Sequence, residues 1–161
     1  MKADQKIIPF LWFDNNAQEA IDFYATIFKD VKIVQEVCNG KGWPGPEGSL
    51  LTAIFEIEGQ KFQVLNGGPQ FKFTEAISMF AVCNTQQEID EKWEKLTADG
   101  GEESQCGWLK DKFGLSWQIA PQILGDMIAD KDPEKAARVM QAMMQMVKID
   151  IQKLQDAYDG K

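Results

Sequence analysis

The hydrophobic and polar positions along the chain change their period several times, and each change predicts a new element. Residues 7–13 are apolar, aromatic and β-branched, which is typical of a strand, and Asp14-Asn15-Asn16 after them predicts a turn into a helix. Apolar residues then recur at steps of three and four over 17–29, which predicts an amphipathic helix. Three further strands are predicted over 31–38, 50–57 and 61–65. The order of this first half is βαβββ.

The same order begins again in the second half. Residues 76–82 predict a strand, and Thr85 with Glu88 three positions later predicts a capping box for the helix that follows. Gly100-Gly101 ends that helix, and short strands are predicted around 103–110 and 115–120.

Beyond Pro121 the pattern is helical only. Asp132-Pro133 predicts a helix start, since Pro suits the first helical position. An apolar stripe over 136–147, continued by Ile151 and Leu154, is too apolar to lie in water, so we expect this tail to dock on a module or across a dimer interface. The predicted fold is α+β, with two repeated βαβββ modules and a C-terminal helical tail. We expect a single domain over 1–161, with module one at about 7–69, module two at about 76–121 and the tail at about 122–158.

An internal repeat relates the two halves. Four residues of the first helix region recur 69 positions later, and four residues around the last strand recur 55 positions later. The difference of 14 residues is about the size of the Gly/Pro-rich loop over 39–48, which only the first half contains. Two halves with one open sheet face each are expected to pack around a shared cleft, the default binding site. The pairs are Asn15/Asn84, Gln18/Gln87, Glu19/Glu88, Tyr24/Trp93, Gly59/Gly114, Phe62/Trp117, Gln63/Gln118 and Val64/Ile119.

The amino-acid composition excludes several classes of binding partner and of catalytic site. The 161 residues carry a formal charge of −8, which disfavours nucleic acid and anionic membrane surfaces as partners. The chain has no histidine, so Ser-His-Asp and Cys-His catalysis and imidazole zinc sites are excluded. Three cysteines without a CxxC pair suggest neither a disulfide framework nor a zinc site, and no apolar run is long enough for a signal peptide or membrane span. We therefore expect a cytoplasmic protein.

Four segments resemble a known family. They are Pro9–Asp14, Ala20–Tyr24, Leu65–Pro69 and Cys106–Gln118, of which the last is the most specific. Over roughly residues 7–121 the chain resembles the PhnB-like branch of the vicinal oxygen chelate superfamily, the group of glyoxalase I, bleomycin-resistance proteins and extradiol dioxygenases. Members are often labelled 3-demethylubiquinone-9 3-methyltransferase. The resemblance implies paired βαβββ modules, usually assembled as a homodimer.

The resemblance also implies where a metal would be held. In metal-dependent relatives each module contributes one ligand from its first strand and one from its last. The matching positions here are Pro9 and Ser78 for the first strands, and Gln63 and Gln118 for the last. Proline has no ligating side chain and neutral amides bring no charge to offset desolvation of a divalent cation, so we expect neither a catalytic metal nor another cofactor.

Neutral and aromatic residues are the candidates for binding an organic ligand in the cleft. The amides of Gln63 and Gln118 each offer a donor and an acceptor, and an aromatic wall would suit a flat or apolar molecule. Trp43, in the Gly/Pro-rich loop, is a candidate for a lid or a dimer contact. The predicted ligand-binding residues are Trp12, Gln63, Ser78, Trp108 and Gln118, with Phe13 and Trp117 considered for the same wall.

Three functions follow from these residues. The first is a homodimeric protein that binds a small organic molecule without a catalytic metal. The second is an enzyme, either metal-dependent, or a methyltransferase as the family label states, or one using carboxylates such as Asp14 or Asp111. The third is a structural domain that binds a partner through its tail. No catalytic residue is assigned, because Cys106 beside Lys110 and Asp111 is the only plausible thiolate cluster and the chain has no histidine to activate it.

Overall fold

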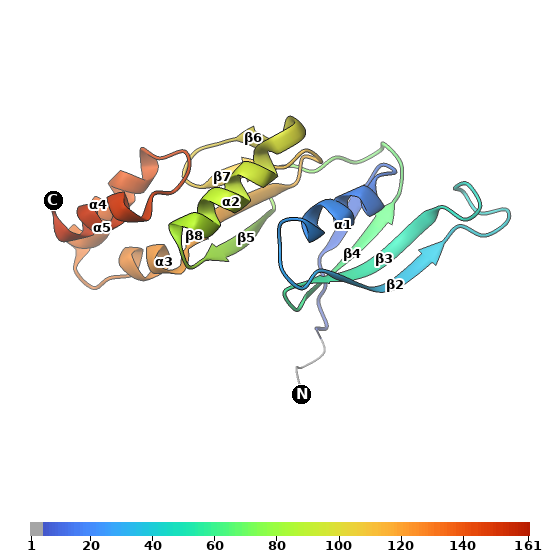
Figure 1. Ribbon diagram of the computed structural model, residues 1–161, viewed down its shortest axis with the longest axis horizontal. Coiled ribbons are helices and arrows are strands. Elements are labelled where there is room, and N and C mark those ends of the chain that lie inside the picture. Colours follow the sequence, from blue (N-terminus) through green and yellow to red (C-terminus); the bar gives the residue numbers. More distant parts are fainter. Residues whose placement is uncertain (1–4) are drawn as a thin grey trace. The chain divides into compact units, whose positions relative to one another are not determined.

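The computed structural model describes residues 5–161, which form two compact units (Figure 1). The first unit extends to Lys72 and the second is Phe73–Lys161. The division lies between the two predicted modules. Across the described residues, none of the helices combines the length and the apolar character needed to cross a bilayer.

The first unit is one four-stranded sheet with a helix on one face. Its elements are β1 (Phe10–Phe13), α1 (Ala17–Ala25), β2 (Lys32–Cys38), β3 (Leu50–Ile57) and β4 (Gln60–Asn66). The strand order is β1-β4-β3-β2, and β1 runs parallel to β4 while the other pairs are antiparallel. The predicted βαβββ order is therefore confirmed for this half, although α1 ends four residues before the predicted Lys29.

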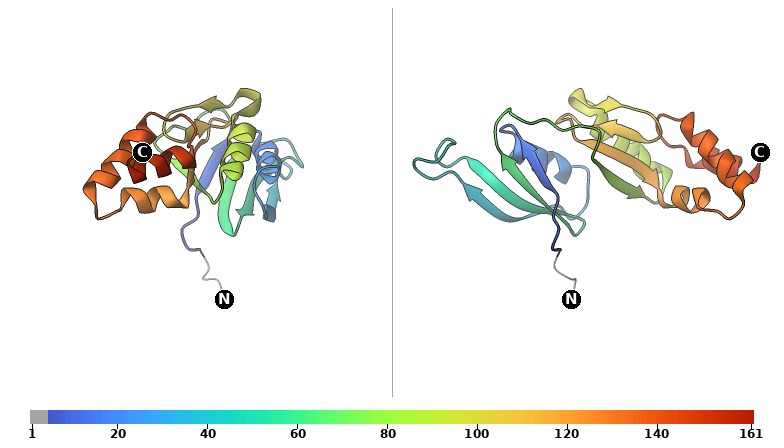
Figure 2. Two further views of the ribbon diagram at one scale, coloured as in Figure 1. Left: turned by 60° about the vertical axis from the view of Figure 1, so that its left-hand side comes forward. Right: turned by 180° about the vertical axis from the view of Figure 1, so that it is seen from behind.

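Alternation along the strands separates a covered face from an open one. Leu11 and Phe13 of β1 are buried with Phe55, Phe62 and the apolar stripe of α1, and the rings of Phe55 and Phe62 stack 5.4 Å apart. Phe10, one position out of phase with Leu11, is 53% exposed. Successive side chains of a strand point to opposite faces, so Phe10 belongs to the face that α1 does not cover. Figure 2 shows the helix on one side of the sheet only.

The second unit repeats this architecture, and three of its four strands are shorter than their counterparts. Its elements are β5 (Ser78–Cys83), α2 (Gln86–Thr97), the 3₁₀ turn η1 (Ala98–Gly100), β6 (Glu102–Glu103), β7 (Trp108–Lys110) and β8 (Ser116–Pro121). The strand order is β5-β8-β7-β6, with β5 parallel to β8. The capping box is confirmed: Thr85 Oγ1 accepts from the Glu88 N–H at 3.2 Å, and the Glu88 carboxylate accepts from the Asn84 N–H at 2.7 Å.

The predicted strand over 103–110 is wrong in its middle. A turn over 104–107 interrupts it, because Cys106 (φ 60°) and Gly107 (φ 82°) are both left-handed and cannot continue an extended strand. The result is two short strands, β6 and β7, which complete the second βαβββ module.

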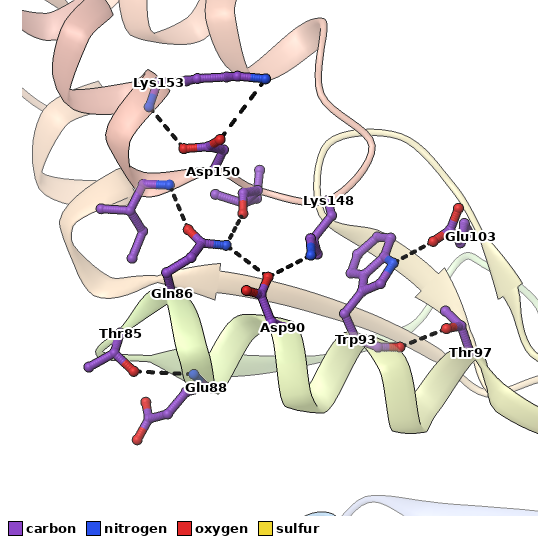
Figure 3. Close-up of polar contacts among 12 residues, drawn as sticks. Thr85, Gln86, Glu88, Asp90, Trp93, Thr97, Glu103, Lys148, Asp150 and Lys153 are labelled. Atoms are coloured by element: carbon purple, nitrogen blue, oxygen red, sulfur yellow. Dashed lines mark hydrogen bonds and ion pairs between the residues drawn. The ribbon is translucent and has the colours of Figure 1, made fainter.

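The tail forms α3 (Gln122–Ile128), α4 (Pro133–Met144) and α5 (Ile151–Asp159), all within the second unit. Asp132 caps α4 and Pro133 occupies its first turn, as predicted. The Gln86 side chain on α2 donates to the Ile149 carbonyl at 3.0 Å and accepts from the Ile151 N–H at 2.9 Å, and Lys148 pairs with Asp90 at 2.6 Å (Figure 3). The prediction that the tail docks on a module is confirmed, and the module is the second.

Candidate functional site

Three of the predicted ligand-binding residues are adjacent on the open face of the second sheet. Gln118 of β8 donates from Nε2 to Ser78 Oγ of β5 at 2.9 Å, and Trp108 of β7 is the register partner of Gln118 on its other side. Leu109 and Ile119, one position out of phase, are buried beneath α2. Gln118 therefore stands between a hydroxyl and an indole on the uncovered face.

The other two predicted residues, Trp12 and Gln63, lie on the open face of the first sheet. Trp12 Nε1 donates to the Gly68 carbonyl at 2.9 Å, and the Phe71 ring meets the indole edge-on with centroids 4.9 Å apart. The indole also lies directly against Gly67, where an added Cβ would be 2.3 Å from the ring. These contacts fix the orientation of Trp12.

The strand register corrects the predicted equivalence of Pro9 and Ser78. Gln63 pairs with Phe10 in the first sheet, and Gln118 pairs with Phe80 in the second. Equivalent positions in the first strands of the two modules are thus 70 residues apart in the sequence, whereas equivalent positions in their helices are 69 residues apart. The connection from strand to helix cap is one residue longer in the first module, from Phe13 to Asn16, than in the second, from Cys83 to Thr85.

This register reveals two residues that the sequence analysis missed. Phe10 and Phe80 occupy equivalent positions, are 53% and 56% exposed, and each stands beside the glutamine of its own sheet. Each open face therefore carries a phenylalanine next to a glutamine. Every residue of these two strands except Ser78 is apolar, so no alternation in the sequence marked the two rings, and only the pairing register identifies them.

The residues at the metal-ligand positions do not fit a divalent cation. Pro9, Ser78, Gln63 and Gln118, the four positions that the resemblance gives to metal ligands, carry no negative charge, and the register partners Phe10 and Phe80 add none. Among residues 5–161, no three Cys, Asp or Glu side chains come together as a possible metal cluster. Neutral and apolar side chains at these positions do not offset the desolvation of a divalent cation.

The remaining aromatic candidates divide between core and loop. Phe13 and Trp117 are 3% and 4% exposed and belong to the helix-covered cores, so the structure does not place them on the open faces. Trp43 is 49% exposed in the loop between β2 and β3. Asn39 holds that loop, because its Nδ2 donates to Ser49 and its Oδ1 accepts from the Gly45 N–H.

An ion-pair cluster lies at the edge of the second open face. The Lys110 ammonium is 3.1 Å from both the Glu75 and the Glu102 carboxylates. The ammonium donates hydrogen bonds to these carboxylates, to Glu102 foremost, and this raises the pKa of Lys110, so the lysine stays protonated and is not a general base. The hydroxyl of Ser116, between Ser78 and Lys110 in the register, is buried without a hydrogen-bond partner.

Asp111 and Asp14, the two carboxylates considered for acid–base catalysis, differ in their exposure to solvent. Asp111 is 2% exposed and accepts hydrogen bonds from the Phe113 N–H, the Leu115 N–H and the Trp117 indole at 2.9, 3.1 and 2.9 Å. Its oxygens organise a turn and are not presented to a ligand. Asp14 is exposed and lines an open hollow of about 530 Å³ in the first unit, beside Asn15 and the loop around Gly45. None of the five predicted ligand-binding residues lines this hollow.

Comparison with solved structures supports the fold and the relationship. A PhnB protein from Bacillus cereus, described as a putative 3-demethylubiquinone-9 3-methyltransferase, is 35% identical, and the match covers 73% of this chain and 99% of that protein with a TM-score of 0.67. A protein from Pseudomonas aeruginosa, 17% identical, matches 73% of this chain and 97% of its own length with a TM-score of 0.60.

A third structure extends the likeness in fold. It is the genomically encoded fosfomycin resistance protein of Listeria monocytogenes, complexed with Mn(II) and a sulfate ion. It is 16% identical, and the match covers 70% of this chain and 88% of that one with a TM-score of 0.50. No curated protein matches the chain.

The family comparison covers most of the chain. The family model described as 3-demethylubiquinone-9 3-methyltransferase matches residues 5–120, the two modules without the helical tail. With the PhnB protein as a 35% identical relative and the repeated βαβββ fold, the chain belongs to this PhnB-like family of the vicinal oxygen chelate superfamily.

Proposed function

We propose that this protein binds a small organic molecule on the open faces of its two sheets, without a catalytic metal. The observation that carries the proposal is the repeated pair of an exposed phenylalanine and a glutamine, Phe10 with Gln63 and Phe80 with Gln118. Exposed aromatic rings on a sheet leave apolar area that a ligand can cover, and a few placed polar groups fix its orientation.

The hydrogen-bonding state of the amides suggests the chemistry of the ligand. Gln118 uses one N–H on Ser78, which leaves its carbonyl oxygen and second N–H to meet a ligand. Trp108 stands beside this amide and offers a flat apolar surface. The arrangement suits a molecule with a planar or apolar body and at least one neutral polar group.

The proposal includes a homodimer. Val34 and Val82 are 50% and 49% exposed and leave apolar area that a second copy of the chain can cover. The edges β1 and β5 leave one side of each strand without a neighbour in its sheet. Light scattering at micromolar concentration is expected to give twice the 18.2 kDa of one chain, and a monomer would contradict this part.

Native mass spectrometry of the full chain, purified without added metal, tests the binding proposal. We expect a retained organic mass that disappears under denaturing conditions and is lost in Gln118→Ala. The matched control is Gln87→Ala, an exposed glutamine on α2, which should keep the mass. A bound divalent metal lost in Gln118→Ala would replace this proposal by the metal-dependent enzyme. Loss of the organic mass in neither variant would place the ligand elsewhere.

The family description favours methyl transfer as the second candidate. The same spectra test it, because a retained nucleotide-type methyl donor has a mass distinct from that of a simple apolar ligand. A methyl donor retained by wild-type protein would support this candidate over simple binding.

A further inference from the structure

The helical tail lies outside the part of the chain that the family shares. The family match ends at residue 120, and α3, α4 and α5 follow it. The tail is nevertheless packed tightly on the second unit, since Val139, Ile149 and Leu154 are 0% exposed. Such close packing lets the tail influence the structure of the second module.

Two main-chain hydrogen bonds join the tail to the turn before β7. The Cys106 N–H donates to the Met146 carbonyl and the Gly107 N–H donates to the Val147 carbonyl, both at 2.8 Å. On the opposite side, the Gly107 carbonyl accepts from the Ile119 N–H of β8 at 2.8 Å. The turn is thus held between the sheet and the tail.

The turn has a conformation that needs such support. Cys106 has a φ of 60°, which costs energy for a residue with a Cβ. At Gly107 an added Cβ would lie 2.9 Å from both the Ile119 carbonyl oxygen and Ile149 Cγ1. Ile149 therefore packs directly on the glycine, where only a residue without a side chain fits.

Trp108 takes its position from this turn. It follows Gly107 directly, its N–H donates to the Gln105 carbonyl at 3.1 Å, and its carbonyl accepts from the Ser104 N–H at 2.9 Å. Its side chain lies on the open face beside Gln118. Gly107, which the tail contacts, is therefore directly bonded in the chain to Trp108 on the proposed ligand face.

We propose that the tail is a positioning element for the ligand face of the second module. Ile149 and the carbonyls of Met146 and Val147 hold the Cys106–Gly107 turn, and the turn sets the orientation of Trp108 toward Gln118. The role of Trp108 in binding rests on the proposed function, but its positioning by the tail does not. Ile149 acts through the turn and is a positioning residue.

The test is ¹⁹F NMR of the full chain labelled with 5-fluorotryptophan, which gives one resonance for each of the five tryptophans. Trp108→Phe assigns the resonance of Trp108. In Ile149→Ala we expect that resonance to shift or broaden, while those of Trp12 and Trp43 in the first unit stay in place. Spectra are recorded well below the melting transition, where a general loss of stability leaves native resonances unmoved.

Val139→Ala is the matched control, because Val139 is as buried as Ile149 but belongs to α4. We expect it to lower the melting temperature and leave Trp108 unmoved. Hydrogen exchange gives a second readout: the Cys106 and Gly107 amides should exchange at least about tenfold faster in Ile149→Ala. Where Ile149→Ala does not fold, Ile149→Val provides the smaller change.

An unmoved Trp108 resonance in the Ile149 variant, or an equal shift in Val139→Ala, would overturn the proposal and leave the tail a general stabiliser. Because neither readout uses a ligand, this failure is distinct from a failure to find retained ligand by mass spectrometry.

Discussion

The two modules share one topology but stabilise their sheets in different ways. In the first, β3 and β4 have eight and seven residues and are joined by a two-residue turn at Glu58-Gly59, with φ values of 50° and 87°. In the second, β6 and β7 have only two and three residues. The first sheet is held by its long ladders, whereas the second depends on side chains and on the tail.

In the second sheet, side-chain hydrogen bonds such as those of the buried Asp111 take the place of long runs of backbone hydrogen bonds between strands. The Asp111 carboxylate accepts hydrogen bonds from two backbone N–H groups of the loop between β7 and β8 and from the Trp117 indole of β8. On the edge of the same sheet, Trp93 donates to the Glu103 carboxylate at 2.6 Å. Local side-chain hydrogen bonds of this kind let a short-stranded sheet keep its shape, and they make it sensitive to single substitutions.

Removing the tail should give the largest difference between the modules. A chain ending at Pro121 loses Val139, Met146, Ile149 and Leu154 from the second unit and uncovers the surface beneath them. We expect a melting temperature lower by roughly 10 °C or more and strong binding of an apolar dye. Calorimetry and dye fluorescence measure these two effects. A melting curve equal to that of the full chain would contradict the dependence of the second sheet on the tail.

The next largest effect is expected for Asp111→Ala. It leaves two buried donors and one part-buried donor without their acceptor, which should lower the free energy of unfolding by about 3–4 kcal/mol. The matched control in the first module is Asp14→Ala, at an exposed carboxylate, which should change it by less than about 0.5 kcal/mol. Urea unfolding followed by circular dichroism compares the two, and equal losses would show that Asp111 has no special role.

Gly67→Ala tests the packing on the first open face. The new methyl group would overlap the Trp12 indole, so we expect a loss of about 2 kcal/mol and a changed near-ultraviolet circular dichroism signal. Gly125→Ala on α3, where nothing lies within 4 Å of the added Cβ, should be neutral or slightly stabilising. An unchanged Trp12 signal in Gly67→Ala would contradict the close contact.

The smallest effect is expected from pH. Hydrogen bonds from Lys148 and then Gln86 lower the pKa of Asp90 below its usual range. The stability that this carboxylate contributes is therefore complete above the unfolded pKa of about 4 and is lost as the pH falls through the lowered value. The melting temperatures of wild type and Asp90→Asn should differ at pH 7, and the difference should shrink as the pH falls below the unfolded pKa of about 4. A difference that stays constant over the acid range would show that this ion pair is not its source.

Much of this architecture is predictable because it is local. The alternation in β3 and β4, the capping box at Thr85 and the Asp132-Pro133 helix start are each written in a few consecutive residues. The turn at Cys106-Gly107 was not predictable, since its left-handed cysteine is held by tail residues about 40 positions away. The candidate site was likewise predicted only in part. The glutamines were found through the repeat, but Phe10 and Phe80 were missed because a one-residue difference in a connection shifts the strand register.

The central claim, that the Phe–Gln pairs on the open faces bind a small organic molecule, can be tested directly by NMR. Side-chain amide resonances of Gln63 and Gln118, assigned with Gln63→Ala and Gln118→Ala, are followed while a library of neutral aromatic fragments is added to the ¹⁵N-labelled protein. We expect fragments that bind to shift these two side-chain amide resonances and to perturb the indole N–H resonance of Trp108 more than that of Trp43. Shifts confined to Asn15, Asn39 and the other residues lining the hollow of the first unit, or no saturable shift at either glutamine, would contradict it.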